Sequence, residues 1–351
     1  MSKTWRVGIL GLGHWYSAYG LARALPEYPR AELAAVAWHN REQLETFTGT
    51  FNVPGYTDYG ALLEREDIDI VHIAPPVSEI PDCTIAAARA GKHIVLGKPM
   101  AMTVQQADEM VQAVEAAGVL CVPFQGINRL RNAGLKARIE AGLIGDIVLL
   151  HQASRWSIAE DWYRSGKPGW FADPNHVPGG ALIDEGIYGL DLFQWLAGSE
   201  IVQVEARTGN LVHKEIQVED WGMATFTFAN GIVATLEGAW TINAPRKTGP
   251  SPKQNSVLRL EIIGTKGEII DQKPGFPGRA ILAGGAPGWV FEQHAEELFG
   301  PPIPNPLDHL IDCLERGEQP VATIQDARKT FAAMMAAYES ARGGRSVHLS
   351  V

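Results

Sequence analysis

Three places in this 351-residue sequence combine residue types and spacings that could bind a ligand or move a proton. Gly11-Leu12-Gly13 stands between an expected strand and an expected helix. One glycine there permits a tight turn, and the next lets the backbone approach a pyrophosphate held at the helix N-terminus. Lys98 follows a strand expected at 93–96, at the edge where parallel sheets bind ligands. Asp184 and Tyr188 are spaced i, i+4, which places both side chains on one face of a helix.

An aromatic and polar segment precedes the Asp-Tyr pair. Indole faces pack on the C–H faces of sugars, while Arg and His side chains hydrogen-bond hydroxyl groups. His176 could also supplement Tyr188 as an acid–base group. The alternative interpretation is a loop held by its own aromatic side chains. We expect a substrate-binding wall formed by Arg155, Trp156, Trp162, Trp170 and His176.

The end of the second expected strand lacks the acid that usually binds the adenosine ribose hydroxyls. Residues 38–41 read Trp-His-Asn-Arg instead. Without a carboxylate nothing there would repel a 2′-phosphate, and His39 and Arg41 could pair with one, while Trp38 could cover the adenine. The sequence therefore slightly favours NADP over NAD. A simply solvated Arg41 is the alternative.

The elements that must position these residues fall into two domains. Over residues 1–124, short β-branched runs alternate with helical stretches, which is typical of a doubly wound parallel sheet. From residue 125 to 351 a helix at 180–196 is followed mainly by alternating strands, including a hairpin at Asn230-Gly231. We expect an α/β Rossmann domain followed by an α+β domain with a large, mainly antiparallel open sheet. The C-terminal helices could pack back on the first domain, and the Gly- and Pro-rich segments 243–256 and 272–288 predict surface loops.

Composition and missing motifs exclude several classes of protein. The chain is 46% hydrophobic with a net charge of −10 and no basic block, so we expect no nucleic-acid or membrane partner. The three cysteines are far apart and the histidines lack metal-ligand spacing, so we expect neither disulfides nor a metal. No apolar run reaches the ~18–20 residues of a membrane span, and the N-terminus leads directly into a strand, so we expect a cytoplasmic protein. The motifs of P-loop kinases and α/β-hydrolases are absent.

The sequence resembles the glucose–fructose oxidoreductase / inositol dehydrogenase / MocA (Gfo/Idh/MocA) family of nicotinamide-dependent sugar oxidoreductases. The resemblance implies a Rossmann domain, NAD or NADP as cofactor, a sugar-like substrate, and a homodimer or homotetramer formed through the C-terminal sheet. It extends over nearly the whole chain and is carried by Gly11–Gly13, Pro75-Pro76, the 91–99 segment GKHIVLGKP, Gly142-Leu143-Ile144-Gly145, the 179–188 segment GGALIDEGIY and Ile263-Gly264-Thr265-Lys266-Gly267.

The resemblance also implies roles for individual residues. Lys98 aligns with the active-site lysine of a Glu-Lys-Pro motif, which reads Gly97-Lys98-Pro99 here and so lacks the acid that helps hold the nicotinamide ribose. Asp184 and Tyr188 match the second signature, with tyrosine where many members have histidine, and Arg129 matches a substrate or hinge arginine. The expected cofactor-binding residues are Gly11, Gly13, His14, Trp15, Trp38, His39, Arg41, Pro75, Pro76 and Lys98.

The chemistry explains why a lysine and a tyrosine belong together. Lowering a tyrosine pKa from ~10 to ~7.5 requires about 3.4 kcal/mol of preferential stabilisation of the phenolate. An ammonium ~4 Å away supplies about 1 kcal/mol in water but about 4 kcal/mol at an effective dielectric constant of ~20. Lys98 can therefore tune Tyr188 only where bulk water is excluded, and Asp184 would orient substrate hydroxyls.

These features predict an NAD(P)-dependent dehydrogenase or reductase. Hydride would pass between nicotinamide and a secondary hydroxyl or ketone of a sugar, cyclitol or glycoside, with Lys98 and Tyr188 as the proton-transfer pair. Two alternatives stay open. One is a redox-assisted glycoside hydrolase or lyase with tightly bound NAD, and the other is a nucleotide-responsive binding protein.

Overall fold

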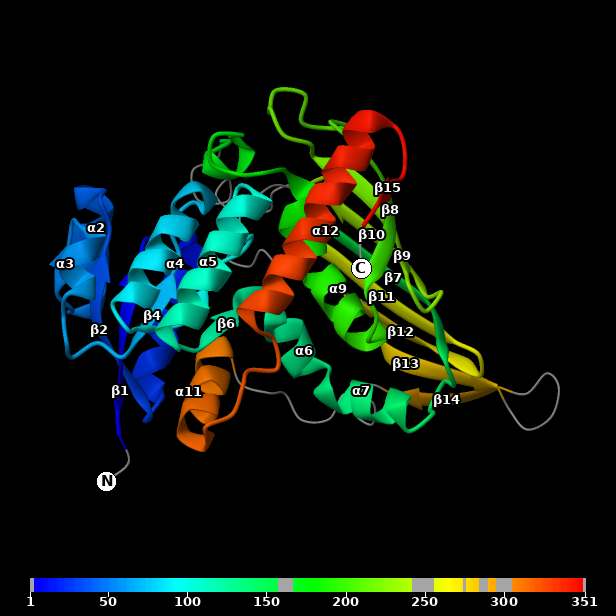
Figure 1. Cartoon of the computed structure of the whole chain (residues 1–351), viewed down its shortest axis with the longest axis horizontal. Helices are drawn as coiled ribbons and strands as arrows, with labels where there is room; N and C mark the ends of the chain where they lie inside the picture. The colour runs from blue at the N-terminus through cyan, green and yellow to red at the C-terminus, as the bar shows by residue number, and fades with distance from the viewer. Residues whose placement is uncertain are drawn as a thin grey trace. The chain divides into compact units, whose positions relative to one another are not determined.

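The chain divides into two compact units in the computed structural model (Figure 1), which describes residues 3–156, 167–241, 256–273, 276–283, 290–294 and 305–349. Unit 1 comprises Met1–Gly126, Asn175–Pro178 and Pro304–Phe331. Unit 2 comprises Ile127–Pro174, Gly179–Ile303 and Ala332–Val351. A short loop at 175–178 and the segment 304–331 therefore belong with unit 1, although both follow the start of unit 2 in the sequence.

Unit 1 contains a six-stranded parallel sheet, which confirms the predicted Rossmann fold. Its order is β3-β2-β1-β4-β5-β6, so the strand order reverses at β1, where ligands bind in open α/β sheets. The strands are β1 (Trp5–Leu10), β2 (Ala31–Ala37), β3 (Gly55–Tyr56), β4 (Ile70–Ile73), β5 (His93–Leu96) and β6 (Cys121–Pro123).

Helices flank this sheet (Figure 1), and their apolar sides form its core. Tyr19 and Phe47 pack around Ile9 and Val36 on one side. Next to this cluster, on the same side of the sheet, the late helix α11 contributes Leu307, Leu310 and Ile311 to a second cluster with residues of β1, β4, β5 and β6. The helices are α1 (Trp15–Ala24), α2 (Arg41–Phe51), α3 (Tyr59–Leu63), α4 (Ile80–Arg89), α5 (Val104–Ala117) and α11 (Pro306–Arg316), with a 3₁₀ turn η2 (Val77–Glu79) before α4.

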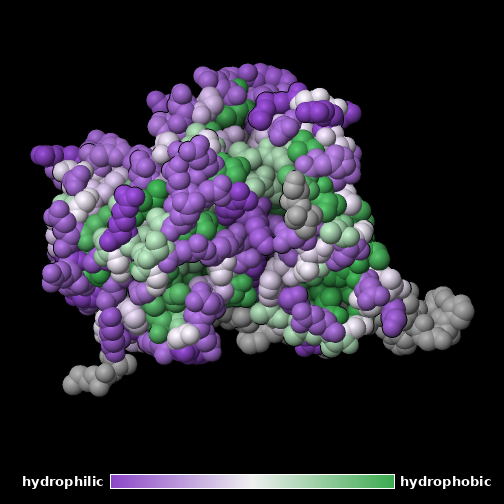
Figure 2. Space-filling model, in the orientation of Figure 1, coloured by the Kyte–Doolittle hydropathy of each residue, from purple (hydrophilic) through white to green (hydrophobic). Residues whose placement is uncertain are grey.

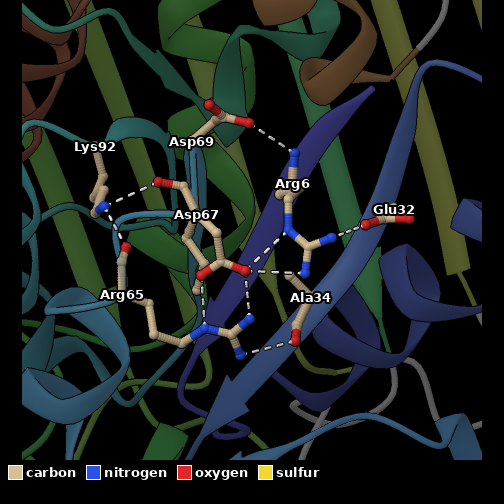
Figure 3. Close-up of polar contacts among 8 residues, drawn as sticks. Arg6, Glu32, Ala34, Arg65, Asp67, Asp69 and Lys92 are labelled. Carbon is tan, nitrogen blue, oxygen red and sulfur yellow. Dashed lines mark hydrogen bonds and ion pairs between the residues drawn. The ribbon is translucent and has the colours of Figure 1, made fainter. Parts of the chain in front are cut away.

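The amino-terminal ends of these strands are tied by charged groups (Figure 3). The Asp67 carboxylate lies between two guanidinium groups, 3.0 Å from Arg6 Nη2 and 2.7 Å from Arg65 Nη2. The Arg65 hydrogen bond and the nearby Arg6 charge lower the pKa of Asp67 to about 2. Lys92 Nζ, at the start of β5, donates to the carbonyl oxygens of Arg65 (2.7 Å) and Ile68 (2.9 Å).

Unit 2 is built on a nine-stranded mixed sheet, which confirms the predicted large and mainly antiparallel sheet. Its order is β14-β13-β12-β11-β7-β10-β9-β8-β15, and β7 and β10 run parallel. The strands are β7 (Ile147–Trp156), β8 (Ile201–Gly209), β9 (Trp221–Phe228), β10 (Val233–Ala239), β11 (Ser256–Gly264), β12 (Gly267–Lys273), β13 (Phe276–Ala283), β14 (Val290–His294) and β15 (Val347–His348).

Helix α9 (Ala181–Ala197) lies along one face of this sheet, against β7, β9 and β10 (Figure 1). The last part of α12 (Ile324–Gly343) runs beside it, and a Cβ at Gly186 would touch Met334 Cε at 3.4 Å. The preceding elements of unit 2 are α6 (Ile127–Arg131), α7 (Ala133–Glu140) and the 3₁₀ turn η4 (Trp170–Ala172).

One loop prediction is wrong. The Gly- and Pro-rich segment 272–288 was expected to form a surface loop, but it contains the end of β12 and the whole of β13. Because β13 pairs with β12 on one side and β14 on the other, tertiary pairing outweighs the local preference of Gly and Pro for turns. The other predicted loop, 243–256, lies outside the described residues except for Ser256, which begins β11.

Hydrophilic side chains predominate on the face drawn in Figure 2, with apolar side chains scattered among them in small groups. Among the described residues, no helix has the length and apolar character needed to cross a bilayer.

Candidate active site

The glycine turn lies at the carboxyl end of β1, in close contact with the segment that follows β4. Gly11 has φ +88°, and a Cβ there would lie 2.4 Å from Pro75 N. A Cβ at Gly13 would lie 2.6 Å from Pro76 Cδ. Both glycines are therefore required by the approach of the Pro75-Pro76 backbone.

Helix α1 begins directly after this turn. Within the described part of the chain it starts without a side-chain cap from His14 and without an acid in its first turn. By contrast, Asn40 caps α2 and Thr103 forms a capping box at α5. Amide groups at a helix start bind anions such as the pyrophosphate of a dinucleotide. The backbone amide groups at the start of α1 therefore fit the pyrophosphate of a dinucleotide.

A buried polar cluster lies beside this turn. His14 is 2% exposed, and its Nδ1 lies 3.4 Å from the Tyr16 hydroxyl. Burial, followed by the Lys98 and His72 charges, holds the pKa of His14 well below its usual range. Burial also lowers the pKa of His72 to about 4, and its Nε2 lies 3.1 Å from Ser17 Oγ. Both imidazoles are therefore neutral near pH 7, and the cluster's positive charge is that of the Lys98 ammonium.

Lys98 follows β5 and is 4% exposed. A Cβ at the preceding Gly97 would lie 2.6 Å from the Ile73 carbonyl oxygen, so the β4 backbone occupies the space that any side chain at position 97 would need. The absent acid of the Glu-Lys-Pro motif thus has a steric explanation in this chain.

The residues after β2 mostly contact their own neighbours in unit 1. Trp38 is 5% exposed, belongs to the core around Phe47, and donates from Nε1 to Gln43 Oε1 at 2.8 Å. The His39 ring lies against the Trp38 ring with centroids 3.9 Å apart and planes tilted by 41°, and Arg41 is exposed at the start of α2. Trp38 therefore presents little surface to a ligand.

His176 belongs to unit 1, through the 175–178 loop. The Ser78 amide donates to the His176 carbonyl at 3.2 Å, and Ser78 Oγ lies 2.9 Å from His176 Nδ1. Ser78 follows Pro75-Pro76, the segment that contacts the glycine turn. The His176 imidazole is therefore held by a residue of this same segment.

In unit 2, the start of α9 is held by a buried carboxylate from another segment. Glu219, which lies two residues before β9, accepts hydrogen bonds from the amides of Gly180 (2.9 Å, Oε2) and Leu182 (3.1 Å, Oε1). Its carbonyl oxygen accepts from the Ala181 amide at 3.0 Å. Burial raises the pKa of Glu219, and these hydrogen bonds to the ionised form oppose that shift.

Tyr338 of α12 completes this arrangement. Its hydroxyl accepts from the Ile183 amide (3.1 Å) and donates to Glu219 Oε1 (2.6 Å). Burial, followed by the Glu219 charge, raises the pKa of Tyr338, so the phenol keeps its proton. A Cβ at Gly179 would lie 2.2 Å from the Tyr338 ring, and one at Gly180 would lie 2.0 Å from the Glu219 carbonyl. The glycine pair therefore makes room for this clamp.

Helix α9 is also held in its middle, next to Tyr188. Asn128 Nδ2 donates to the Tyr188 carbonyl at 3.2 Å. Arg129 makes a bidentate ion pair with Asp191, 2.7 Å from Nε and 3.1 Å from Nη2, and both side chains are buried. Asp184 is 4% exposed, whereas Tyr188 is only half-buried. The Arg129 guanidinium thus holds α9, and its expected contact with substrate stays a prediction.

The predicted aromatic wall is distributed over different surfaces. Trp156 and Ser154 lie on the α9 side of β7, where Trp156 Nε1 donates to Ser154 Oγ (3.3 Å) and Ser154 donates to Glu185 (2.8 Å). Since side chains alternate along a strand, Arg155 lies on the opposite side, where it pairs with Glu237. Trp170 stacks on Phe171 with centroids 4.0 Å apart, and Trp162 lies outside the described residues.

Comparison with known proteins gives the family. Residues 5–124 match the oxidoreductase family with an NAD-binding Rossmann fold, and residues 133–270 match the Gfo/Idh/MocA C-terminal domain. A dTDP-3,4-didehydro-2,6-dideoxy-alpha-D-glucose 3-reductase of Streptomyces violaceoruber is 30% identical, over 73% of this chain and 77% of that protein. The chain belongs to the Gfo/Idh/MocA family of oxidoreductases.

Two further similarities extend over almost the whole chain. The scyllo-inositol 2-dehydrogenase (NAD(+)) of Bacillus subtilis (strain 168) is 26% identical, over 99% of this chain and 96% of that protein. A levoglucosan dehydrogenase solved in complex with NADH superposes with a TM-score of 0.83 at 22% identity, covering 99% of this chain and 100% of that one. This Gfo/Idh/MocA protein is thus an oxidoreductase with an NAD-binding domain, and its relatives named here are dehydrogenases or reductases.

Sequence reasoning overlooked four residues, two in each unit, that hold candidate site residues of this Gfo/Idh/MocA protein. Ser78 and Glu79 follow Pro75-Pro76 directly, so their place after a strand end was a usable signal. Glu219 lies 39 positions from Gly180, whose amide it accepts, and Tyr338 lies 155 positions from Ile183. No local spacing in the sequence could have linked either residue to the start of α9.

Proposed function

We propose that this protein transfers hydride between a nicotinamide and a secondary hydroxyl or ketone of a sugar, cyclitol or glycoside, with Lys98 and Tyr188 as the proton-transfer pair. The observation that carries the proposal is the set of hydrogen bonds that fixes the backbone of α9. Glu219 and Tyr338 fix its start, and Asn128 donates to the Tyr188 carbonyl, while the Tyr188 side chain is only partly buried. A phenol on a fixed backbone with access to its surroundings suits proton transfer.

The other residues have roles that follow from their surroundings. The nicotinamide, when bound, supplies or accepts the hydride. The Lys98 ammonium stabilises the phenolate form of Tyr188, which then takes the hydroxyl proton during oxidation and returns it during reduction. Asp184 orients a substrate hydroxyl by accepting its hydrogen bond. His176, whose ring is fixed by Ser78, is a second acid–base candidate.

The test is the variant Tyr188→Phe. We expect turnover to fall at least 100-fold, the order expected for loss of a general base or acid. NADH binding, followed by nicotinamide fluorescence, should not change. Tyr28→Phe, at a partly buried tyrosine that packs against the unit 1 core cluster, is the matched control and should keep full turnover. Near-normal turnover in Tyr188→Phe would contradict the assignment.

The substrate class follows the named relatives, which act on an inositol and on a nucleotide-linked keto sugar. Trp156 and Trp170 are the aromatic groups of unit 2 that we propose contact the sugar, and Arg155 is left out because Glu237 engages it on the other face of the sheet. A panel of inositols, free sugars and glycosides, assayed in both directions, tests this choice. Net hydrolysis or elimination is not favoured, because the named relatives are dehydrogenases and reductases.

We also propose that a second copy covers the sheet face opposite α9. That face carries Met223, which is 43% exposed, and Trp221, whose Nε1 donates to Glu237 at 3.1 Å. Light scattering of the purified protein tests this, and a monomer at micromolar concentration would contradict it.

A further inference from the structure

The last residue of β2 and the residue that follows β4 both contact the glycine turn. Gly11 N donates to the Ala37 carbonyl, and His14 N donates to the Ala74 carbonyl, each at 2.8 Å. Strands β2 and β4 are the two neighbours of β1 in the sheet. In Rossmann domains the acid that binds the adenosine ribose comes from the end of the second strand. A carboxylate held near that strand end from the β4 side could serve the same purpose.

The four residues that directly follow β2, at 38–41, include no carboxylate. Trp38 is buried and bonded to Gln43, and the Asn40 side chain accepts the Gln43 amide as the cap of α2. His39 remains accessible, with 59% of its side chain exposed. Considered alone, this side chain would suit a 2′-phosphate.

The β4 side supplies a carboxylate at this place. Glu79, the last residue of η2, accepts the Tyr59 hydroxyl at 2.9 Å through Oε2. The same oxygen lies 3.9 Å from His39 Nδ1. Burial, followed by the Glu79 charge, raises the pKa of Tyr59, so the phenol remains a donor and fixes the carboxylate. The Glu79 side chain is 32% exposed and thus accessible to a ligand.

We propose that Glu79 replaces the missing acid of β2 and makes the protein prefer NAD(H) over NADP(H). A carboxylate accepts hydrogen bonds from the two ribose hydroxyls, whereas it repels a 2′-phosphate. Its proximity to His39 also places a negative charge beside the side chain that a 2′-phosphate would contact. The proposal rests on the proposed function, since it assumes that a nicotinamide dinucleotide binds at the glycine turn. It reverses the slight preference for NADP that the sequence after β2 indicated.

The experiment compares NADH and NADPH affinities by nicotinamide fluorescence, without substrate, for the wild-type protein and Glu79→Gln. We expect the wild type to bind NADH at least 10-fold more tightly. Glu79→Gln should lower the ratio of NADH to NADPH affinity at least 10-fold, or about 1.4 kcal/mol. Asp82→Asn is the matched control, because this carboxylate is exposed in the first turn of α4 and should leave the ratio unchanged.

The outcomes separate this inference from the proposed function. A wild type that prefers NADPH, or a ratio unchanged in Glu79→Gln, overturns the role of Glu79 while leaving the oxidoreductase assignment intact. Failure of the wild type to bind either nucleotide overturns both. Should Glu79→Gln fold poorly, Tyr59→Phe, which removes only the hydroxyl that fixes the carboxylate, should shift the ratio in the same direction, and no shift would again contradict the proposal.

Discussion

The two ends of the six-stranded sheet in unit 1 are built from opposite kinds of contact. At the amino end, the charges of Arg6, Arg65 and Asp67 are paired with one another, and Lys92 donates to two carbonyl oxygens (Figure 3). At the carboxyl end, glycines touch proline backbone, histidines are buried and neutral, and the Lys98 charge has the histidines as neighbours.

This difference places the contacts that suit a ligand at one end of the sheet. The charged groups at the amino end hold the strands together, and because they are paired with one another they are not available to bind a ligand. The close contacts at the carboxyl end make room for one, because glycines without side chains and an α1 start without a side-chain cap can accept a pyrophosphate. Substitutions at the amino end should therefore change stability without changing nucleotide affinity.

The largest effect should come from restoring the family's acid at the carboxyl end. Gly97→Glu places a Cβ 2.6 Å from the Ile73 carbonyl, so we expect the free energy of unfolding to fall by about 3 kcal/mol or more. Denaturant unfolding measures this. Gly49→Ala in α2 is the control, since no atom lies within 4 Å of its added Cβ, and it should not destabilise. A stable Gly97→Glu protein that binds NADH more tightly would refute the steric explanation.

The second effect concerns pH and the buried imidazole of His72. Its folded pKa of about 4 lies below the ordinary value of 6.5, so the unfolded chain binds more protons between these values. Stability contributed by neutral His72 is complete above pH 6.5 and is lost as the pH falls toward 4, by up to about 3 kcal/mol. His72→Gln can keep a bond to Ser17 and should flatten this dependence in denaturant titrations. Substitution of the exposed His348 is the control and should leave the pH dependence of stability unchanged. An identical slope of unfolding free energy against pH in His72→Gln and wild type would count against the prediction.

The smallest effect should appear at the amino end. Lys92→Met leaves the carbonyls of Arg65 and Ile68 without their buried donor, which costs about 2 kcal/mol of unfolding free energy. NADH affinity should not change, because the substitution lies at the end of the sheet away from the glycine turn. Lys3→Met removes an exposed ion pair with Asp69 and a cation–π contact with Trp5, and should cost less than about 1 kcal/mol. Weaker NADH binding in Lys92→Met would show that the two ends are not independent.

Much of the fold could be predicted because its signals are local. Strand–helix alternation up to Phe124 and the turn at Asn230-Gly231 both correspond to elements that the structure contains. The 272–288 segment could not be predicted, since its Gly and Pro content favours turns while pairing on both sides of β13 requires a strand. The inclusion of the 175–178 loop in unit 1 also depends on contacts distant in sequence.

The candidate site was predictable where one motif carries it. Gly11, Lys98 and the Asp184–Tyr188 pair could each be located from their neighbours in sequence. Their supporting residues could not, because Glu79 reaches the end of β2 only through the strand order, and Glu219 reaches α9 only through the sheet. The sequence after β2 showed which acid was missing but not that another strand end brings a carboxylate next to His39.

The clamp at the start of α9 has a consequence for the order of folding. Its amides bond to a residue just before β9 and to a residue near the C-terminus, so three distant parts of the chain must meet before the helix has a fixed first turn. Contacts of such long sequence separation form late when loop closure limits the rate. The amides of Leu182 and Ile183 should therefore be among the last to gain protection from hydrogen exchange during refolding, and a nascent chain ending before Tyr338 would carry Tyr188 without its final geometry.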